Sequence, residues 1–189
     1  MTAAPPLGLN PSHMRNRKGR IMFRRPLAVL AVLVVALPAH AQDAPKRLGK
    51  SGAWEAYVYP EGGGKVCYMA AQADRLQGGD KGRVGSAIAI THRPKSPGEV
   101  SLIAGYGFKK ESEAEIQIGG MKHTFFTNGK SAWAKDSKAD GAIVTAMIKG
   151  REVTVRAVPN KGGAVTDSVP LSGFGDALAA IDKACGVKR

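Results

Sequence analysis

Short runs of alternating apolar and polar residues, separated by turn-forming residues, constrain the fold of this chain more than any other feature. Residues 112–118, SEAEIQI, and residues 151–158, REVTVRAV, both alternate in this way. A period of two is typical of a β-strand with one face buried and the other in water. Residue pairs such as Asn128-Gly129 follow several of these runs and predict tight hairpin turns.

The whole series predicts about eight strands and two short helices. The strand runs are 53–60, 65–71, 86–92, 99–108, 112–118, 121–127, 131–135, 151–158 and 164–171, of which 131–135 is the weakest. The polar, glycine-rich stretch 72–85 is expected to be a surface loop. Asp140 precedes the first helix, 142–149, where an N-cap belongs, and Ser172 precedes the second, 174–185. Because two helices are too few for a parallel βαβ sheet, the pattern predicts an all-β sandwich or barrel.

The N-terminal segment has the three parts of an export signal. Basic residues are followed by an apolar run, 27–37, and by small residues at Ala39 and Ala41, which predicts a signal peptide over 1–41 that is cleaved after Ala41. The alternative is a membrane anchor, but eleven apolar residues fall short of the roughly 20 that cross a bilayer. Met22 is a second candidate start, because the chain from that residue is itself a complete signal peptide.

The remaining chain is expected to be a flexible leader, 42–50, followed by a single domain, 51–189. The full sequence has 28 Lys and Arg against 15 Asp and Glu, and six of these cations lie in the signal. The exported part therefore carries a net charge of +7, well below the dense basic stripe of a nucleic-acid-binding protein. Such a surface suits anionic lipids or lipopolysaccharide, or simply keeps the protein soluble.

The chain contains two cysteines, Cys67 in a strand run and Cys185 at the end of the second helix. Cys185 shares one helix face with Phe174, Leu178 and Ile181, so it is expected to point at the core. An exported protein with an even number of cysteines favours a disulfide, and here only one intramolecular pairing exists. We therefore predict a Cys67–Cys185 disulfide, with buried thiols or a reactive nucleophile as the alternatives.

Residues that could carry chemistry form no recognisable catalytic, cofactor-binding or metal-binding motif. His92 and His123 have no neighbours at the spacing of metal ligands, so packing or surface roles are expected. Glu111, Glu113 and Glu115 alternate and would share one strand face, where a solvated surface is favoured over paired acid–base chemistry. The sequence thus predicts no catalytic residue, no cofactor and no metal.

The aromatic residues are the remaining candidates for a binding groove. They include Trp54, Tyr57, Tyr59, Tyr106, Phe125, Phe126 and Trp133, and most are expected to fill the core. Phe125 and Phe126 are consecutive in an expected strand and must point to opposite faces. One of the two is therefore predicted to lie on the surface, as a hint of binding.

Several segments in order resemble the invasion-associated locus B family. They are GGGKVCYMAAQ, ITHRP, EVSLIAGYGFK, TFFTNGKSAWAKD, AMIKG and TDSVPLSGFGDALAAIDKAC, within residues 51–185, and the last is the most specific. The resemblance implies an exported alphaproteobacterial protein with an immunoglobulin-like β-sandwich. The family takes its name from a factor that promotes entry into red blood cells, and it implies no catalytic residue. Relatives often have Arg-Gly-Thr where this chain has Lys161-Gly162-Gly163.

Together these observations lead us to expect a periplasmic, non-enzymatic protein that binds a partner or supports the cell envelope. The expected partner is a protein or an anionic envelope component, not nucleic acid, and no transmembrane anchor is expected after signal cleavage. Outer-membrane association and secretion are the other locations considered. The rival functions are an enzyme that acts on envelope glycans or lipids, and a carrier with a closed apolar cavity.

Overall fold

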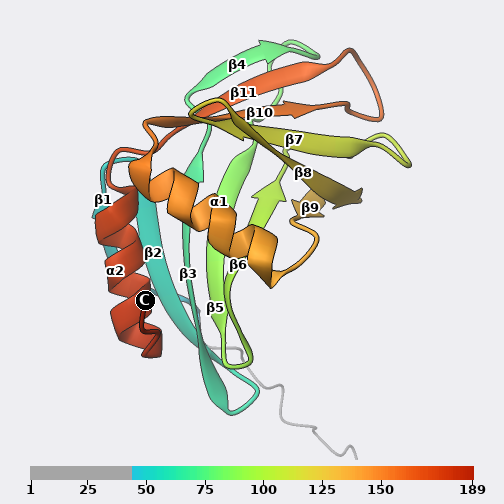
Figure 1. Cartoon of the computed structure of the whole chain (residues 1–189). Helices are drawn as coiled ribbons and strands as arrows, with labels where there is room; N and C mark the ends of the chain where they lie inside the picture. Colours follow the sequence, from blue (N-terminus) through green and yellow to red (C-terminus); the bar gives the residue numbers. More distant parts are fainter. Residues whose placement is uncertain (1–43) are drawn as a thin grey trace, which may run out of the picture. The chain divides into compact units, whose positions relative to one another are not determined.

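Eleven antiparallel strands and two helices make up residues 44–189, the part of the chain that the computed structural model describes (Figure 1). The strands are β1 (Lys46–Ser51), β2 (Trp54–Glu61), β3 (Gly64–Gln72), β4 (Arg75–Gly78), β5 (Ala87–Arg93), β6 (Ser96–Ile103), β7 (Glu113–Ile118), β8 (Met121–Asn128), β9 (Ser131–Trp133), β10 (Glu152–Ala157) and β11 (Val165–Pro170). The helices are α1 (Ser137–Lys149) and α2 (Phe174–Cys185). The predicted signal peptide, 1–41, lies outside the described residues.

The strands form one continuous sheet in the order β1-β2-β3-β5-β6-β9-β8-β7-β10-β11-β4. The three-residue strand β9 joins a first half, β1-β2-β3-β5-β6, to a second half, β8-β7-β10-β11-β4. Figure 1 shows the strands of the two halves running in different directions, so that the sheet folds over on itself as a sandwich. The prediction of an all-β sandwich with one internal and one C-terminal helix is confirmed, with eleven strands in place of about eight.

The core forms where the inner faces of both halves meet the two helices. Its largest fully buried side chains include Trp54, Met69, Ile88, Ile90, Leu102, Ile116, Ile118, Phe125, Ile143, Met147, Phe174 and Ile181. The ring of Trp54 meets that of Phe174 edge to face at 4.9 Å between centroids, and its indole N–H donates to the Pro170 carbonyl. Because buried aromatic N–H groups need an acceptor, this bond fixes α2 against β2.

The N-cap residues of both helices differ from the sequence prediction. The N-cap of α1 is Asp136, whose carboxylate accepts from the Ala139 amide, so the helix begins five residues before the predicted range. The N-cap of α2 is Gly173, not Ser172, and it has a left-handed backbone, φ +84°. A Cβ at Gly173 would lie 2.0 Å from the Ser51 carbonyl oxygen, so the close approach of β1 excludes any side chain there.

Two segments predicted as irregular are strands at the edges of the sheet. The prediction of a flexible leader over 42–50 is wrong from Lys46 onward, where β1 pairs with β2. The expected surface loop 72–85 contains β4, which pairs with β11. Both strands are largely exposed on both faces, so they lack the apolar alternation that reveals a half-buried strand, and backbone pairing alone holds them.

A disulfide joins Cys67 in the middle of β3 to Cys185 at the end of α2, with 6.0 Å between the two Cα atoms. Cys67 is fully buried. Beside it, Nε2 of buried His92 lies 2.7 Å from a carboxylate oxygen of Asp182 on α2. The C-terminal helix is thus fastened to the first half-sheet by one covalent bond and one buried polar contact. Within residues 44–189, neither helix has the length and apolar character that a bilayer crossing requires.

Candidate functional site

The outer face of the first half-sheet carries a trough whose floor consists of small side chains. The core lies on the other face, where α1 and α2 pack (Figure 1). Ala89, Thr91 and Ser101 point away from this core, yet they are only 5%, 8% and 9% exposed. Larger side chains on both sides shield these three residues from solvent. The larger side chains also form the walls of an open groove of about 460 Å³. This volume is within the usual range of ligand pockets.

Strand register places aromatic walls on both sides of this floor. Tyr68 on β3 lies opposite Thr91 on β5, and Trp133 on β9 lies opposite Ser101 on β6. Tyr59 on β2 extends the first wall. Three strand spacings separate β3 from β9, so the backbones of these two strands are about 14 Å apart. We call this surface, with Tyr59, Tyr68 and Trp133 over Ala89, Thr91 and Ser101, the aromatic trough.

Ring stacking holds the walls in place. Tyr57 stacks on Tyr68 at 5.1 Å between centroids, and Phe126 stacks on Trp133 at 5.6 Å. Such pairs limit side-chain rotation, so a partner would not have to order the rings on binding. Phe126 is 52% exposed while Phe125 is buried in the core. The prediction that one of these two residues lies on the surface is confirmed.

The rim of the trough is polar, and the cation among its lining residues, Arg93, is already partnered. Arg93 donates to a carboxylate oxygen of Glu61 at 2.7 Å across the β2–β3 and β5–β6 hairpins. Pro45, just before β1, lines the same groove as Tyr59 and Tyr68. The walls thus already accommodate a proline ring of the chain itself. The trough therefore suits contact with apolar rings and hydroxyl groups better than capture of an isolated anion.

A second pocket, of about 490 Å³, lies on the other side of Trp133 and is acidic. Glu99, Asp136 and Asp140 line it together with Lys135. Burial raises the pKa of the Asp140 carboxyl, the amide of Val100 that donates to it lowers the pKa, and the charges of Glu99 and Asp136 raise it again. Asp136 and Asp140 both accept backbone amides, so each has a structural role at the start of α1.

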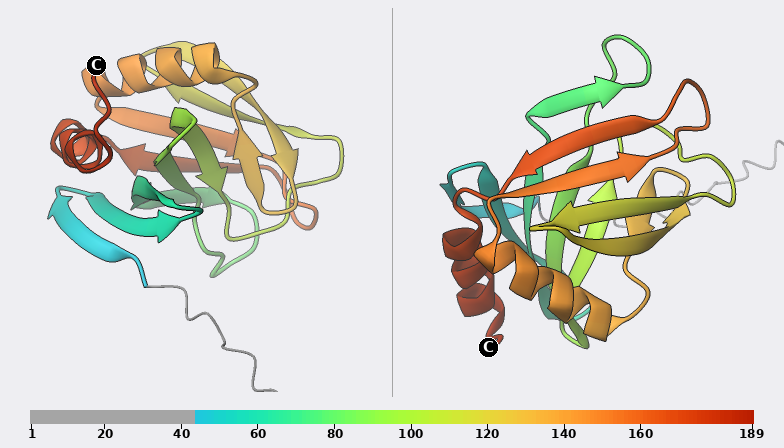
Figure 2. Two further views of the ribbon diagram at one scale, coloured as in Figure 1. Left: turned by 90° about the horizontal axis from the view of Figure 1, so that it is seen from below. Right: turned by 45° about the horizontal axis from the view of Figure 1, so that its top comes forward.

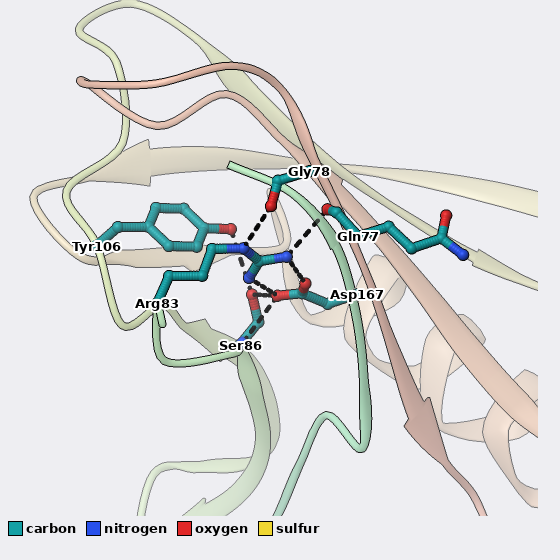
Figure 3. Close-up of polar contacts among 6 residues, drawn as sticks. All are labelled: Gln77, Gly78, Arg83, Ser86, Tyr106 and Asp167. Carbon is teal, nitrogen blue, oxygen red and sulfur yellow. Dashed lines mark hydrogen bonds and ion pairs between the residues drawn. The ribbon is translucent and has the colours of Figure 1, made fainter. Parts of the chain in front are cut away.

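A buried polar cluster that the sequence did not reveal ties the β4–β5 loop to β11 (Figure 3). The Arg83 guanidinium forms a two-pronged ion pair with fully buried Asp167 and also donates to the carbonyls of Gln77 and Gly78. The amide and hydroxyl of Ser86 both donate to Asp167, at 2.9 and 2.8 Å. Ser86 is fully buried, so a substrate cannot reach its hydroxyl. The cluster therefore has a structural role, because it holds the β4–β5 loop against β11.

Tyr106 completes this cluster from the β6–β7 loop. Its hydroxyl lies 3.3 Å from that of Ser86, and its ring lies 6.0 Å from the guanidinium carbon of Arg83. The bond to Asp167 raises the pKa of Arg83, and burial raises that of Tyr106. The sequence signal for the cluster was weak, because Arg83 and Asp167 are 84 residues apart and single charges in polar stretches usually face water.

The histidines and glutamates that the sequence singled out do not come together as a site. Nδ1 of His92 accepts from the Gly98 amide at 2.9 Å, so the proton is on Nε2, which donates to Asp182. Both ring nitrogens are therefore in use. Glu115 on β7 pairs with Lys122 and Arg156 on the surface. Glu111 lies outside β7 with a left-handed backbone, φ +58°, so the prediction of a common face for the three glutamates is wrong at that residue.

The architecture defines a small, disulfide-bonded β-sandwich protein with a grooved outer face. The model of the family described as Invasion associated locus B (IalB) protein matches residues 54–182, and the chain belongs to this family. Among the solved structures, invasion associated protein B from Bartonella henselae is similar in fold, with a TM-score of 0.54 and 20% sequence identity. The match covers 72% of this chain and 97% of that one. Among curated proteins, none matches this sequence.

Proposed function

We propose that this member of the invasion-associated locus B family is a non-enzymatic, periplasmic protein that binds a protein partner through the aromatic trough. The observation that carries the proposal is the buried floor of Ala89, Thr91 and Ser101 between preformed aromatic walls. The disulfide supports export, because such bonds persist in oxidising compartments. Association with the outer membrane and support of the envelope are compatible with the same binding role.

The dimensions of the trough favour an extended segment of the partner. The walls rise from β3 and β9, so the trough runs along β5 and β6 and has the direction of a strand. Aromatic-lined grooves of this kind bind extended, proline-containing segments, which lose little conformational entropy on binding. Pro45 beside Tyr59 and Tyr68 is an example of such a contact within the chain itself. The hydroxyls of Thr91 and Ser101 add polar partners in the floor.

Site-specific photocrosslinking would test the proposal. A photoreactive residue at Ser101 should crosslink the partner in exporting cells, and the same group at Ile148, which is 53% exposed on α1, should not. The purified partner should then bind Trp133→Ala and Tyr68→Ala variants at least roughly tenfold more weakly, as expected for central aromatic contacts. Ile148→Ala is the matched control. Equal affinity of the Trp133→Ala and Ile148→Ala variants would contradict the proposal.

The acidic pocket supports the main rival, an enzyme that acts on envelope glycans or lipids. A carboxyl with a raised pKa beside other carboxylates and an aromatic ring is an arrangement that general acid catalysis uses. Hydrolysis of purified envelope glycan or phospholipid by the protein, lost in Asp140→Asn and Glu99→Gln, would favour this rival. The third candidate, a carrier of a small apolar ligand, has less support, because large side chains such as Trp54, Phe125 and Phe174 fill the space between the half-sheets.

A further inference from the structure

Four loops meet at one end of the described domain, next to the Arg83 cluster (Figures 1 and 2). They are residues 79–86, 104–112, 129–130 and 158–164. The Phe108 amide donates to the Gly129 carbonyl, the Lys109 amide to the Val158 carbonyl, and the Asn160 amide to the Gly107 carbonyl. A Cβ on Gly162 would lie 3.0 Å from a carboxylate oxygen of Asp80, which places the first loop against the last. We call this surface the loop end.

The loop end carries an excess of positive charge. Its exposed cations are Lys81, Lys109, Lys110, Lys130 and Lys161, against the two acidic residues Asp80 and Glu111. Within residues 44–189, none of these five lysines takes part in an ion pair, whereas Arg75, Arg93 and Arg156 elsewhere on the sheet each pair with a glutamate. The five ammonium groups are therefore free to meet an external anion.

Apolar side chains are exposed among these lysines. Val84 in the first loop is 56% exposed, and Val158 in the last is 37% exposed. Val84 also lies against Gly105, where an added Cβ would come within 2.5 Å of it. Lysines that surround exposed aliphatic groups are typical of surfaces that rest on a membrane, with the apolar groups at the level of the headgroups.

The Arg83 cluster fixes the conformation of the β4–β5 loop at this surface. Lys81 and Val84 lie within two residues of Arg83, whose guanidinium is bound to Asp167, Gln77 and Gly78 (Figure 3). The loop is thus fixed at its base by a buried ion pair while its neighbouring side chains face solvent. A fixed loop presents its charges without an ordering cost when a partner binds.

We propose that the loop end binds the surface of a membrane that is rich in anionic lipid headgroups. Lysine ammonium groups act as point charges, which suit a fluid anionic surface. A defined phosphate site, by contrast, usually contains arginine, whose guanidinium forms bidentate hydrogen bonds with the phosphate oxygens. The one buried arginine at this end is already committed to Asp167. This binding is independent of the aromatic trough, which occupies the outer face of the first half-sheet.

Vesicle sedimentation with the purified exported protein tests this proposal. The protein should sediment with vesicles of phosphatidylglycerol and phosphatidylethanolamine, and not with phosphatidylcholine vesicles, and added salt should weaken the binding. A Lys109→Glu, Lys110→Glu, Lys161→Glu variant should bind at least roughly tenfold more weakly. The matched control, Lys46→Glu, Lys95→Glu, Lys138→Glu, has the same net charge but changes exposed lysines outside the loop end, and it should bind nearly as well as the wild type.

Two further measurements distinguish a membrane surface from a soluble polyanion and from an effect of net charge. Val84→Ser should weaken vesicle binding at high salt, where the apolar contact dominates, and thermal melts should show that all variants fold. An equal loss in both triple variants would overturn the proposal, because net charge alone would then account for the binding. Retention on a heparin column without sedimentation on vesicles would also overturn it, in favour of a free polyanion as the ligand.

Discussion

The C-terminal helix and the β4–β5 loop are both held on the sheet, the helix by a covalent bond and the loop by a buried ion pair. The disulfide between Cys67 and Cys185 holds the end of α2 on β3. The loop depends on the noncovalent pair of Arg83 and Asp167. A disulfide stabilises mainly by restricting the unfolded chain, and its effect grows with the length of the closed segment. A buried ion pair stabilises only while every member of its network is present.

This difference suits what the two regions do. The helix covers the core with Phe174, Leu178 and Ile181, so a covalent bond that tolerates changes of pH and salt holds these apolar side chains in place. The loop carries the exposed side chains of Lys81 and Val84, and the Arg83 network provides directional bonds to the backbone of β4 as well as to β11. Four predictions, in order of decreasing effect on stability, test this contrast.

Asp167→Ala should have the largest effect on stability. It leaves the Arg83 guanidinium and the Ser86 donors buried without their acceptor, and removal of one partner from such a pair costs about 3–5 kcal/mol. Urea denaturation followed by circular dichroism measures the loss. The double variant Arg83→Met, Asp167→Leu should lose less, because no charge stays buried. A double variant less stable than Asp167→Ala would show that the ion pair itself supplies the stability.

Cys185→Ser should lower the free energy of unfolding by about 2–4 kcal/mol, because the cross-link spans 118 residues of the unfolded chain. The same denaturation assay measures the loss, and a reducing agent should lower the wild type to the level of the variant. Unlike Asp167→Ala, this change should leave the Arg83 region intact. If reduction destabilised the Cys67→Ser, Cys185→Ser variant as well, the measured effect would not come from the disulfide.

His92 should make stability depend on pH near neutrality. Burial lowers the pKa of His92 below its ordinary value, although the bond to Asp182 opposes the shift and the charge of Arg189 adds to it. The folded state therefore favours the neutral imidazole more than the unfolded chain does. The contribution of His92 to the free energy of unfolding is complete above the pKa of histidine in the unfolded chain, roughly 6.5. Below that pH the unfolded chain binds the proton more readily than the folded protein does. The free energy of unfolding therefore falls on acidification, by at most about 1.4 kcal/mol per pH unit.

Denaturation of the wild type and His92→Asn at several values between pH 8 and pH 5 measures this dependence. The variant should be less stable at pH 8, because it loses the contacts to Gly98 and Asp182, but its stability should fall less on acidification. Parallel pH profiles for the two proteins would show that other groups cause the dependence.

Arg93→Gln should have the smallest effect. Arg93 and Glu61 pair near the disulfide, but their side chains are 41% and 52% exposed. Water and salt screen such a pair, so its loss should cost about 0.2–1 kcal/mol. The comparison with Asp167→Ala separates burial from charge, since both changes remove one member of an arginine–carboxylate pair. A loss as large as that of Asp167→Ala would show that burial is not the deciding factor.

Local patterns predicted most half-buried elements of this fold. The alternation in residues 112–118 and 151–158 corresponds to β7 and β10, and the expected helix 174–185 has the bounds of α2. Edge strands β1 and β4 were missed because exposure on both faces removes the pattern. The start of α1 was misplaced because Asp136 and Asp140 both suit an N-cap, and the bonds from Ala139 to Asp136 and from Val100 to Asp140 distinguish them.

The amino-acid sequence was sufficient to predict the β-rich class, the bounds of the C-terminal helix and the opposite orientations of Phe125 and Phe126. All three follow from periodicity along a few residues. The folded structure was needed to establish which aromatic rings wall the trough and that Arg83 reaches Asp167. Those contacts join strands that are far apart in the chain. Their positions depend on strand order and register, which no local pattern encodes.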